Sequence, residues 1–382
     1  MFPRISDIVN NIFGLQWNIP IQTYGFMLAI SFATGAWIPY LELKRREKEG
    51  LIPVQHKKAI KARPATVSEL IFTAIFGFIL GWKGFGIVMD YSLFNKDPQD
   101  YILSGEGSWI AGLLCAIFFA GLQYLYGKRK VTKPPAETSV TIHAYQLTWN
   151  ILLIAAITGI LVSKIFDILD HPADLIQDPS GTLFSFTGLS FYGGLIIATL
   201  AVIWYARRNK IPLLQLLDAT APALILAYAI GRSGCQLSGD GCWGIPNLNP
   251  KPEWLSLFPD WVWSFRFPHN VIDDGVLMPQ CKADHCYILP QPVWPTSLYE
   301  SILCLFIFII LWCIRRHLTV PGYLFSIYII MNGIERFLIE QIRINKVYWI
   351  FGMGLSQAQI IAIILILLGL LGLLLFRWLK KK

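Results

Sequence analysis

Nine long apolar runs limit most strongly what this chain can fold into. Each has the length of about 20 residues that an α-helix needs to cross the hydrocarbon core of a bilayer. They cover approximately residues 20–43, 66–90, 108–127, 146–169, 188–207, 219–238, 297–316, 320–341 and 357–379. Inside a bilayer the backbone must satisfy its own polar groups, so such runs predict helices. We therefore expect an all-α polytopic integral membrane protein with about nine transmembrane helices, forming a single transmembrane domain over residues 1–382.

The distribution of charge predicts the orientation of these helices. The 382 residues are 55% hydrophobic and 15% charged, with a net charge of +8. In a soluble protein this charge would suggest nucleic-acid binding, but here most of the 32 Lys and Arg residues lie in alternate loops between the apolar runs. Basic residues accumulate in the cytoplasmic loops of membrane proteins. The pattern predicts an N-terminus outside, a cytoplasmic C-terminus and no nucleic-acid partner.

Two segments outside the apolar runs carry further expectations. The first 18 residues lack the basic-then-apolar pattern of a secretory leader, so we expect no cleaved signal peptide. Residues 239–294, between the sixth and seventh runs, are polar and rich in Pro and Trp, and the predicted orientation places them outside. Their aromatic residues are typical of a bilayer interface. We expect this segment to form an ordered extracytoplasmic cap.

Four of the seven cysteines lie at or beyond the predicted outer face, where disulfides can form. One or two disulfides are expected among Cys235, Cys242, Cys281 and Cys286, for example between the last two. For Cys235 we favour a disulfide with Cys242 or simple packing over a nucleophilic role. The alternative of a metal site that includes His285 is weak, since three ligands within six residues do not make a typical zinc pattern. We predict no metal.

Charged residues within the apolar runs indicate where the function lies. Arg232 stands near the end of the sixth run, where a charge costs roughly 2.5 to 3.5 kcal/mol on insertion scales. In the eighth run, Arg336 and Glu340 are four residues apart and share one helix face. Two guanidinium groups near one leaflet, with one obvious acid, suit an anionic lipid headgroup, because Arg offers a rigid fork of donors to phosphate. For Glu335 we favour an ion pair that only helps charges to insert.

Tyrosines and glycines at the start of two other runs complete the predicted pocket. Tyr24 opens the first run, and Tyr192 directly precedes Gly193 and Gly194 in the fifth. Glycine lets a backbone approach a ligand or a neighbouring helix, so the two glycines favour helix packing at least as strongly as ligand contact. The tyrosines are interpreted as pocket walls, with residues of the interfacial aromatic belt as the alternative.

These motifs together resemble the prolipoprotein diacylglyceryl transferases of bacteria. The stretch GRSGCQLSGDGCWG is similar to the family signature, which reads Gly-Arg-x-Gly-Asn, then an Asn, a Glu and a closing Gly. Supporting stretches occur in the family's order and are YGFMLAI, GLSFYGGLI, PTSLYES, and RFLIEQIR with LSQAQI. The resemblance extends from Tyr24 to about Ile360. Residues 91–147 contain helices that the usual seven-span pattern lacks, which predicts an inserted region.

The resemblance implies transfer of the diacylglyceryl group from phosphatidylglycerol to the lipobox cysteine thiol of prolipoproteins, at the outer face of the bacterial inner membrane and without a cofactor. Such a site binds a phosphodiester in membrane lipid, stabilises the leaving phosphate and removes a thiol proton. The residues assigned to catalysis by this resemblance are Arg232, Arg336, Asp240, Tyr192 and Tyr24. Those assigned to substrate binding are Gly193, Gly194, Gly231, Gly234, Cys235, Ser238, Gly244, Glu340 and Arg343.

The chain departs from the family pattern at four of these positions. Tyr192 stands where the family has a histidine, and Cys235 and Ser238 replace the two asparagines. The pKa of a phenol is about 10, so Tyr192 is protonated at neutral pH and is a poor general base unless arginines lower its pKa. Asp240, which stands in place of the family Glu, is expected to orient Arg232 or the lipid hydroxyls, or to take the proton itself. A thiol that ionises beside the arginines without a dedicated base is the other possibility.

The departures leave a second function open. A catalytically altered paralogue that binds anionic phospholipid or a lipoprotein precursor without transfer would keep the arginines and glycines but need no histidine. A transporter or channel is less favoured, because the polar residues gather at one face of the membrane instead of forming a path across it.

Overall fold

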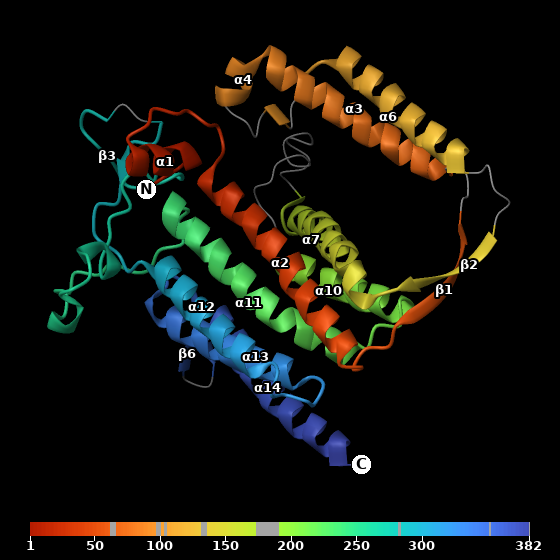
Figure 1. Cartoon of the computed structure of the whole chain (residues 1–382). Coiled ribbons are helices and arrows are strands. Elements are labelled where there is room, and N and C mark those ends of the chain that lie inside the picture. The colour runs from red at the N-terminus through yellow and green to blue at the C-terminus, as the bar shows by residue number, and fades with distance from the viewer. Residues whose placement is uncertain are drawn as a thin grey trace. The chain divides into compact units, whose positions relative to one another are not determined.

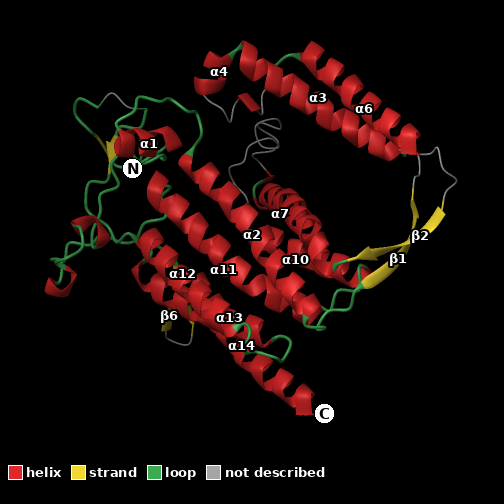
Figure 2. Cartoon of the chain, in the orientation of Figure 1, coloured by secondary structure: helices red, strands yellow, loops and turns green. Residues whose placement is uncertain are grey.

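The structure is a computed structural model that describes residues 1–61, 66–96, 101–102, 105–130, 136–172, 191–281, 284–350 and 353–381. Most of these residues are helical, which confirms the all-α polytopic membrane class (Figures 1 and 2). Within the described residues, 7 helices are long and apolar enough to cross a membrane. The total of nine spans stays a prediction.

The chain divides into two compact units. The larger comprises Met1–Trp17, Gln22–Pro53 and His143–Lys382, and the smaller comprises Asn18–Ile21 and Val54–Ile142. We expected one transmembrane domain with an insertion at residues 91–147, and both statements stay predictions.

The larger unit consists of helices whose bounds follow the predicted apolar runs. Its long helices are α2 (Thr23–Lys48), α7 (Thr148–Asp170), α10 (Phe191–Arg208), α11 (Leu213–Ser238), α12 (Thr296–Ile314), α13 (Tyr323–Ile339) and α14 (Gln357–Lys381). Its short helical elements are α1 (Ile5–Phe13), η1 (Ala144–Leu147), η2 (Glu253–Leu255), η3 (Asp260–Val262) and η4 (Glu340–Ile342). Two antiparallel ribbons pair β3 (Val276–Leu277) with β4 (Tyr287–Ile288), and β5 (Val347–Ile350) with β6 (Met353–Ser356).

Helix α11 is the central element of the larger unit. It packs along α2 and along α12, and it also contacts α13 (Figure 1). Its small residues Ala219 and Ala223 and the apolar Ile225 are almost fully buried, so neighbouring helices approach closely. The helix ends at Gly239, whose φ of 72° is the left-handed conformation that glycine adopts without strain. The chain therefore turns back over the helix end directly after the stretch that contains Arg232.

Buried charges tie the opposite end of α11 to its neighbours. Arg46 of α2 lies 2.9 Å from Glu42 and 3.3 Å from Asp218 of α11. The Asp218 carboxylate also accepts hydrogen bonds from the backbone N–H groups of Gly322 and Phe325, both at 2.9 Å. Because each buried carboxylate has several donors, the network fixes α2, α11 and the start of α13 relative to one another.

The segment between α11 and α12 has a small core of its own. The side chains in that core are Trp243, Phe267, Leu289 and Val293, with Met1 and Phe265 packed against them. The amino group of Met1 donates to the carbonyl of Pro268 at 2.7 Å, and Arg4 lies 2.8 Å from Asp284. The N-terminal residues are therefore part of this layer.

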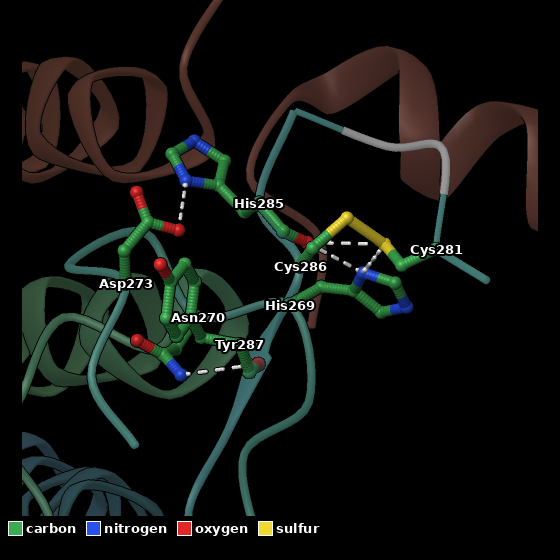
Figure 3. The surroundings of a disulfide bond; sticks show 7 residues. All are labelled: His269, Asn270, Asp273, Cys281, His285, Cys286 and Tyr287. Atoms are coloured by element: carbon green, nitrogen blue, oxygen red, sulfur yellow. Dashed lines mark hydrogen bonds and ion pairs between the residues drawn. A yellow bond between two sulfur atoms is a disulfide. The ribbon is translucent and has the colours of Figure 1, made fainter. Parts of the chain in front are cut away.

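The disulfide between Cys281 and Cys286, which the sequence analysis gave as an example, is present in this segment (Figure 3). Beside it, the His285 ring lies 3.1 Å from the Asp273 carboxylate, and the ring Nδ1 of His269 lies 2.7 Å from the His285 carbonyl. Sulfur atoms joined to each other do not act as thiolate ligands, so the weak metal alternative at these residues is excluded.

The smaller unit contains a helical hairpin and a ribbon. Its elements are β1 (Gln55–Lys61), α3 (Val67–Met89), α4 (Tyr91–Lys96), α6 (Trp109–Lys130) and β2 (Ala136–Ile142), and β1 pairs antiparallel with β2. Thr66 and Glu69 form a capping box that starts α3. A Cβ atom on Gly81 would lie 2.4 Å from the carbonyl oxygen of Ala111, so glycine is required where α3 crosses α6.

Candidate active site

Three arginines converge on one buried carboxylate, that of Glu300 in the second turn of α12. Glu300 is 0% exposed. Its Oε2 lies 3.0 Å from Nε of Arg232 on α11. Its Oε1 lies 3.0 Å from Nη1 of both Arg336 on α13 and Arg343 after η4, and it accepts a hydrogen bond from the Tyr228 hydroxyl at 3.2 Å. Glu300 therefore holds together three guanidinium groups that would otherwise repel one another.

Glu340 is the second acid of this cluster. Its Oε2 lies 3.0 Å from Nη2 of Arg336, the contact that their spacing of four residues predicts. It also accepts hydrogen bonds from Ser356, at 2.7 Å, and from Asn345. The two carboxylates are buried, whereas the three arginine side chains are 17% to 24% exposed. Three arginines thus contact two carboxylates, so the acids in direct contact do not balance the positive charge of this group.

Arg232 contacts a thiol as well as Glu300. Its Nη1 donates to Sγ of Cys242 at 3.3 Å, and its guanidinium lies 5.1 Å from the centroid of the Tyr228 ring. Asp240 contacts a second thiol, that of Cys235, which donates to its Oδ2 at 3.8 Å. In the described contacts Asp240 thus faces Cys235, while Glu300 orients Arg232. Burial raises the pKa of the Asp240 carboxyl group, which makes its ionised form a better proton acceptor.

The ligating atoms of Cys235, Asp240 and Cys242 lie within 4.8 Å of one another. The pKa of the Cys242 thiol is lowered, first by its hydrogen bond with Cys235 and then by the positive charge of Arg232. Two thiols and a carboxylate are suitable ligands for a soft cation. The guanidinium of Arg232, however, lies against Cys242 and opposes the approach of a second positive charge. The electrostatics of this cluster therefore favour a thiolate paired with Arg232.

Helix α2 brings Tyr24 to the same end of α11. A Cβ atom on Gly234 would lie 3.4 Å from the Tyr24 ring and 3.0 Å from Cβ of Met27. Gly234 therefore permits the close approach of α2 beside Cys235. A Cβ atom on Gly231 would meet nothing within 4 Å, so packing does not require a glycine there.

Gly244 closes the loop against the segment that carries Arg343. Its N–H donates to the carbonyl of Trp294 at 2.9 Å, and a Cβ atom on it would lie only 2.3 Å from the carbonyl oxygen of Ile342. A glycine is therefore needed for this approach. Ser238 is 0% exposed and donates to the carbonyl of Gly234 at 2.9 Å, so its hydroxyl is bonded within α11.

The paired glycines of α10 serve helix packing in this structure. A Cβ atom on Gly193 would lie 2.4 Å from the Phe166 ring, and one on Gly194 would lie 1.9 Å from Oγ of Ser163. Both contacts join α10 to α7. The backbone of Tyr192 lies in the first turn of α10, but its side chain is outside the described part of the chain. The role assigned to Tyr192 stays a prediction.

Sequence reasoning missed Glu300 and Tyr228. The available signal for Glu300 was an acid within an apolar run, in the stretch PTSLYES, because such an acid needs a partner at membrane depth. Glu335 behaves differently from the expectation. It is 3% exposed, and among the described residues neither of its carboxylate oxygens has a hydrogen-bond partner, while the nearby arginines pair with Glu300 and Glu340 instead. The ion pair expected for Glu335 is therefore wrong.

Comparison with known proteins identifies the family. The family model described as prolipoprotein diacylglyceryl transferase matches residues 108–375, more than half of the chain. This chain belongs to the prolipoprotein diacylglyceryl transferase family. The match contains every residue assigned to the site except Tyr24. It begins inside residues 91–147 and ends beyond Ile360, and the bounds of an inserted region remain a prediction.

Three curated relatives in this family carry the name phosphatidylglycerol–prolipoprotein diacylglyceryl transferase. The relative from Clostridium novyi is 30% identical over 267 residues, which are 70% of this chain and 90% of that protein. The relative from Leptospira interrogans is 30% identical over 52% of this chain and 63% of its own length. The relative from Corynebacterium efficiens is 29% identical over 53% and 61%, respectively. This chain thus spans less than two thirds of the latter two relatives.

Proposed function

We propose that this protein transfers the diacylglyceryl group of phosphatidylglycerol to the lipobox cysteine thiol of prolipoproteins. The observation that carries the proposal is the cluster of Arg232, Arg336 and Arg343 on Glu300, whose side chains stay partly exposed. The names of the relatives state the same lipid and the same class of protein substrate. Its partners are therefore phosphatidylglycerol, prolipoproteins and the surrounding membrane lipid.

In the proposed reaction Arg232 and Arg336 bind the phosphate oxygens of the lipid. The substrate thiolate attacks the carbon of the diacylglyceryl group that is bonded to the phosphate oxygen. A C–S bond forms there, and the bond between that carbon and the phosphate oxygen breaks. The electron pair of the broken bond leaves with glycerol phosphate, and the arginines stabilise the charge that develops there. Arg343 and Glu340 hold this group of cations in place, and Tyr24 forms one wall of the site.

The substrate thiol must also lose a proton. Asp240 is the acceptor that the geometry supports, because its carboxylate lies beside the thiol pair and burial raises its pKa. Tyr192, at the position of the family histidine, is the second candidate. The pKa of Cys242 is lowered first by its hydrogen bond with Cys235 and then by Arg232 and Arg343, and the same arginines would assist ionisation of a substrate thiol.

The decisive experiment combines purified protein, phosphatidylglycerol and a lipobox-cysteine peptide, with lipidated peptide measured by mass. The wild type is expected to form product and Arg232→Ala to form none, because the phosphate loses its fork of donors. Lys251→Ala is the matched control, since Lys251 is a cation paired with Asp260 in the cap. Tyr192→Phe shows whether that hydroxyl contributes. Saturable lipid binding without product would instead indicate the paralogue that binds without transfer.

We also propose that the protein lies in the bacterial inner membrane with its N-terminus outside and its C-terminus in the cytoplasm. The alternation of basic loops supports this orientation. So does the Cys281–Cys286 disulfide between α11 and α12, because disulfides persist outside the cytoplasm. A fluorescent protein fused after residue 382 should fluoresce, and alkaline phosphatase inserted after Leu257 should be active. The reverse pair of results would overturn the orientation.

A further inference from the structure

Two thiols that the family signature does not contain lie together beside Arg232. Cys235 is in the last turn of α11 and 6% exposed, and Cys242 is partly exposed in the following loop. Their sulfur atoms are within 4.8 Å of each other, and both are free thiols, so the disulfide with Cys242 that the sequence analysis favoured beside simple packing is not formed in this structure. The transfer reaction proposed above uses neither of them.

The loop between the thiols is built to return to the helix end. Gly239 and Gly241 both have a φ of 72°, and the N–H groups of Gly239 and Asp240 both donate to the Cys235 carbonyl, at 3.0 and 3.3 Å. Two glycines in the left-handed region let the chain turn back here without strain. The turn therefore brings the sulfur of Cys242 close to that of Cys235 at the end of α11.

The two thiols differ in reactivity. Arg232 lies 3.3 Å from Cys242, and the pKa of Cys242 is lowered by the Cys235 hydrogen bond and by this charge. The other titratable or charged groups that act on Cys242 and its surroundings are Arg343, Asp240 and Tyr24. A thiolate, and not a thiol, attacks a disulfide, so Cys242 is the attacking sulfur and the more buried Cys235 is the resolving one.

The same segment of the chain already contains an oxidised pair. Cys281 and Cys286 are joined in the cap that begins at Gly239. The compartment that oxidises this pair also reaches the partly exposed Cys242. Arg232 against Cys242 makes a cation a poor occupant of the pair, which leaves oxidation as the chemistry that fits two adjacent thiols.

We propose that Cys235 and Cys242 form a reversible disulfide, so that a redox modification site adjoins the anion site. The Cys242 thiolate attacks one sulfur of a disulfide oxidant, breaks the S–S bond of that oxidant to give a mixed disulfide, and releases a thiolate that takes a proton from water. Cys235 then passes its proton to Asp240, attacks the Cys242 sulfur and releases the second thiolate, which takes up the proton from Asp240. The pair loses two electrons, and the oxidant takes them up as two thiols. The new bond removes the thiolate that accepts from Arg232.

The test uses the full-length protein in detergent, equilibrated in buffers with different ratios of oxidised to reduced glutathione. Free thiols are trapped with N-ethylmaleimide, and the tryptic peptide from Ser233 to Arg266, which contains only these two cysteines, is weighed. In oxidising buffer the mass of the peptide is expected to be lower by that of two hydrogen atoms, and the peptide carries no N-ethylmaleimide label. In reducing buffer it takes up two labels, and the change reverses when the buffer is exchanged.

Variants separate this result from nonspecific oxidation. Cys242→Ser should leave Cys235 fully labelled, and Cys313→Ser, which removes an exposed thiol elsewhere, should leave the pair unchanged. In Arg232→Gln, labelling of Cys242 at neutral pH should slow by about tenfold for each unit that its pKa rises. Faster labelling of Cys235 than of Cys242 in the wild type would contradict Cys242 as the attacking sulfur.

Three results would overturn the proposal. The first is two labels on the peptide at every glutathione ratio while Cys281–Cys286 stays intact. The second is a glutathione adduct on Cys242 that Cys235 never resolves. The third is zinc retained through dialysis that protects both thiols from labelling, which would identify a metal site instead. The test requires no lipid transfer, so its failure and the failure of the proposed function are distinguishable.

Discussion

Glu300 is the residue on which the arrangement of the anion site depends. Arg232, Arg336 and Arg343 come from different parts of the chain, and each lies 3.0 Å from one of its oxygens. Without this carboxylate, three cations with limited access to water would repel one another. In the proposed function the acid therefore acts through the arginines, by holding the donors that bind the lipid phosphate.

Replacement of this acid by its neutral isostere tests that role. Glu300→Gln should abolish transfer and lower the free energy of unfolding by about 3–5 kcal/mol, the usual cost of removing one partner from a buried ion pair. Mass spectrometry of the lipidated peptide measures transfer, and the shift of the thermal unfolding midpoint measures the loss of stability. Glu253→Gln, at an exposed site on η2, should change neither. Wild-type transfer in Glu300→Gln would contradict the role.

Asp240 predicts a dependence of the transfer rate on pH. Burial raises its pKa above the usual value of an aspartate. As the pH falls through this raised pKa, the carboxylate gains a proton and no longer accepts one, so the rate should fall on the acidic side. Asp240→Asn should lose this acidic limb and reduce the rate by about 10²–10⁴-fold, as expected for a lost general base. An unchanged acidic limb in the variant would assign the titration to another group.

At the scale of elements, two chain segments complete the site where helices end. Helix α11 stops at Gly239, and the following loop places Cys242 beside Arg232. Helix α13 continues into η4, after which Arg343 pairs with Gly244 in an isolated β-bridge. The site thus depends on how these two segments meet as much as on the helices themselves.

Gly244→Ala tests the meeting of the two segments. The added Cβ would lie 2.3 Å from the Ile342 carbonyl, so the backbone must move. We expect a loss of about 1–3 kcal/mol in stability, typical of overpacking, and slower transfer because Arg343 moves with it. Gly121→Ala, where a Cβ meets nothing within 4 Å, is the control for both measurements. Equal stability of the Gly244→Ala protein and the wild type would show that the loop adjusts freely.

The cap is the second element that can be tested. Cys281 and Cys286 are separated by 5 positions, and a loop of this size contributes about 2 kcal/mol by restricting the unfolded chain. The double variant Cys281→Ser/Cys286→Ser should therefore be cleaved faster by protease between residues 239 and 294, with transfer retained. Gel mapping of the fragments measures this effect, and Cys313→Ser serves as the control. Unchanged cleavage would mean that the apolar core alone holds the cap.

At the scale of the whole molecule, each predicted apolar run contains a helix, but the bounds differ where local backbone geometry intervenes. The eighth run was predicted over residues 320–341, whereas α13 covers Tyr323–Ile339. Gly322 has a φ of 91° and marks the start of the helix, and the tighter turn η4 follows its end. Hydropathy predicts which segments enter a bilayer, but it does not predict the backbone turns at which a helix begins or ends.

The sequence by itself determined the membrane class and the order of the helices, and it singled out Arg232, Arg336 and Glu340 as charged residues within apolar runs. It did so because helices in lipid require apolar runs, and because a charge within such a run is costly and therefore indicates a function or a partner. The spacing of Arg336 and Glu340 also fixes their contact, since it depends on one helix alone.

Only the tertiary structure decided which groups share the site. Glu300 is separated from Arg232 by the whole cap segment, and the thiols of Cys235 and Cys242 meet because two glycines turn the chain back. Gly193 and Gly194 proved to pack α10 against α7. Such contacts arise from helix packing between distant segments, and periodicity along one segment contains no information about them.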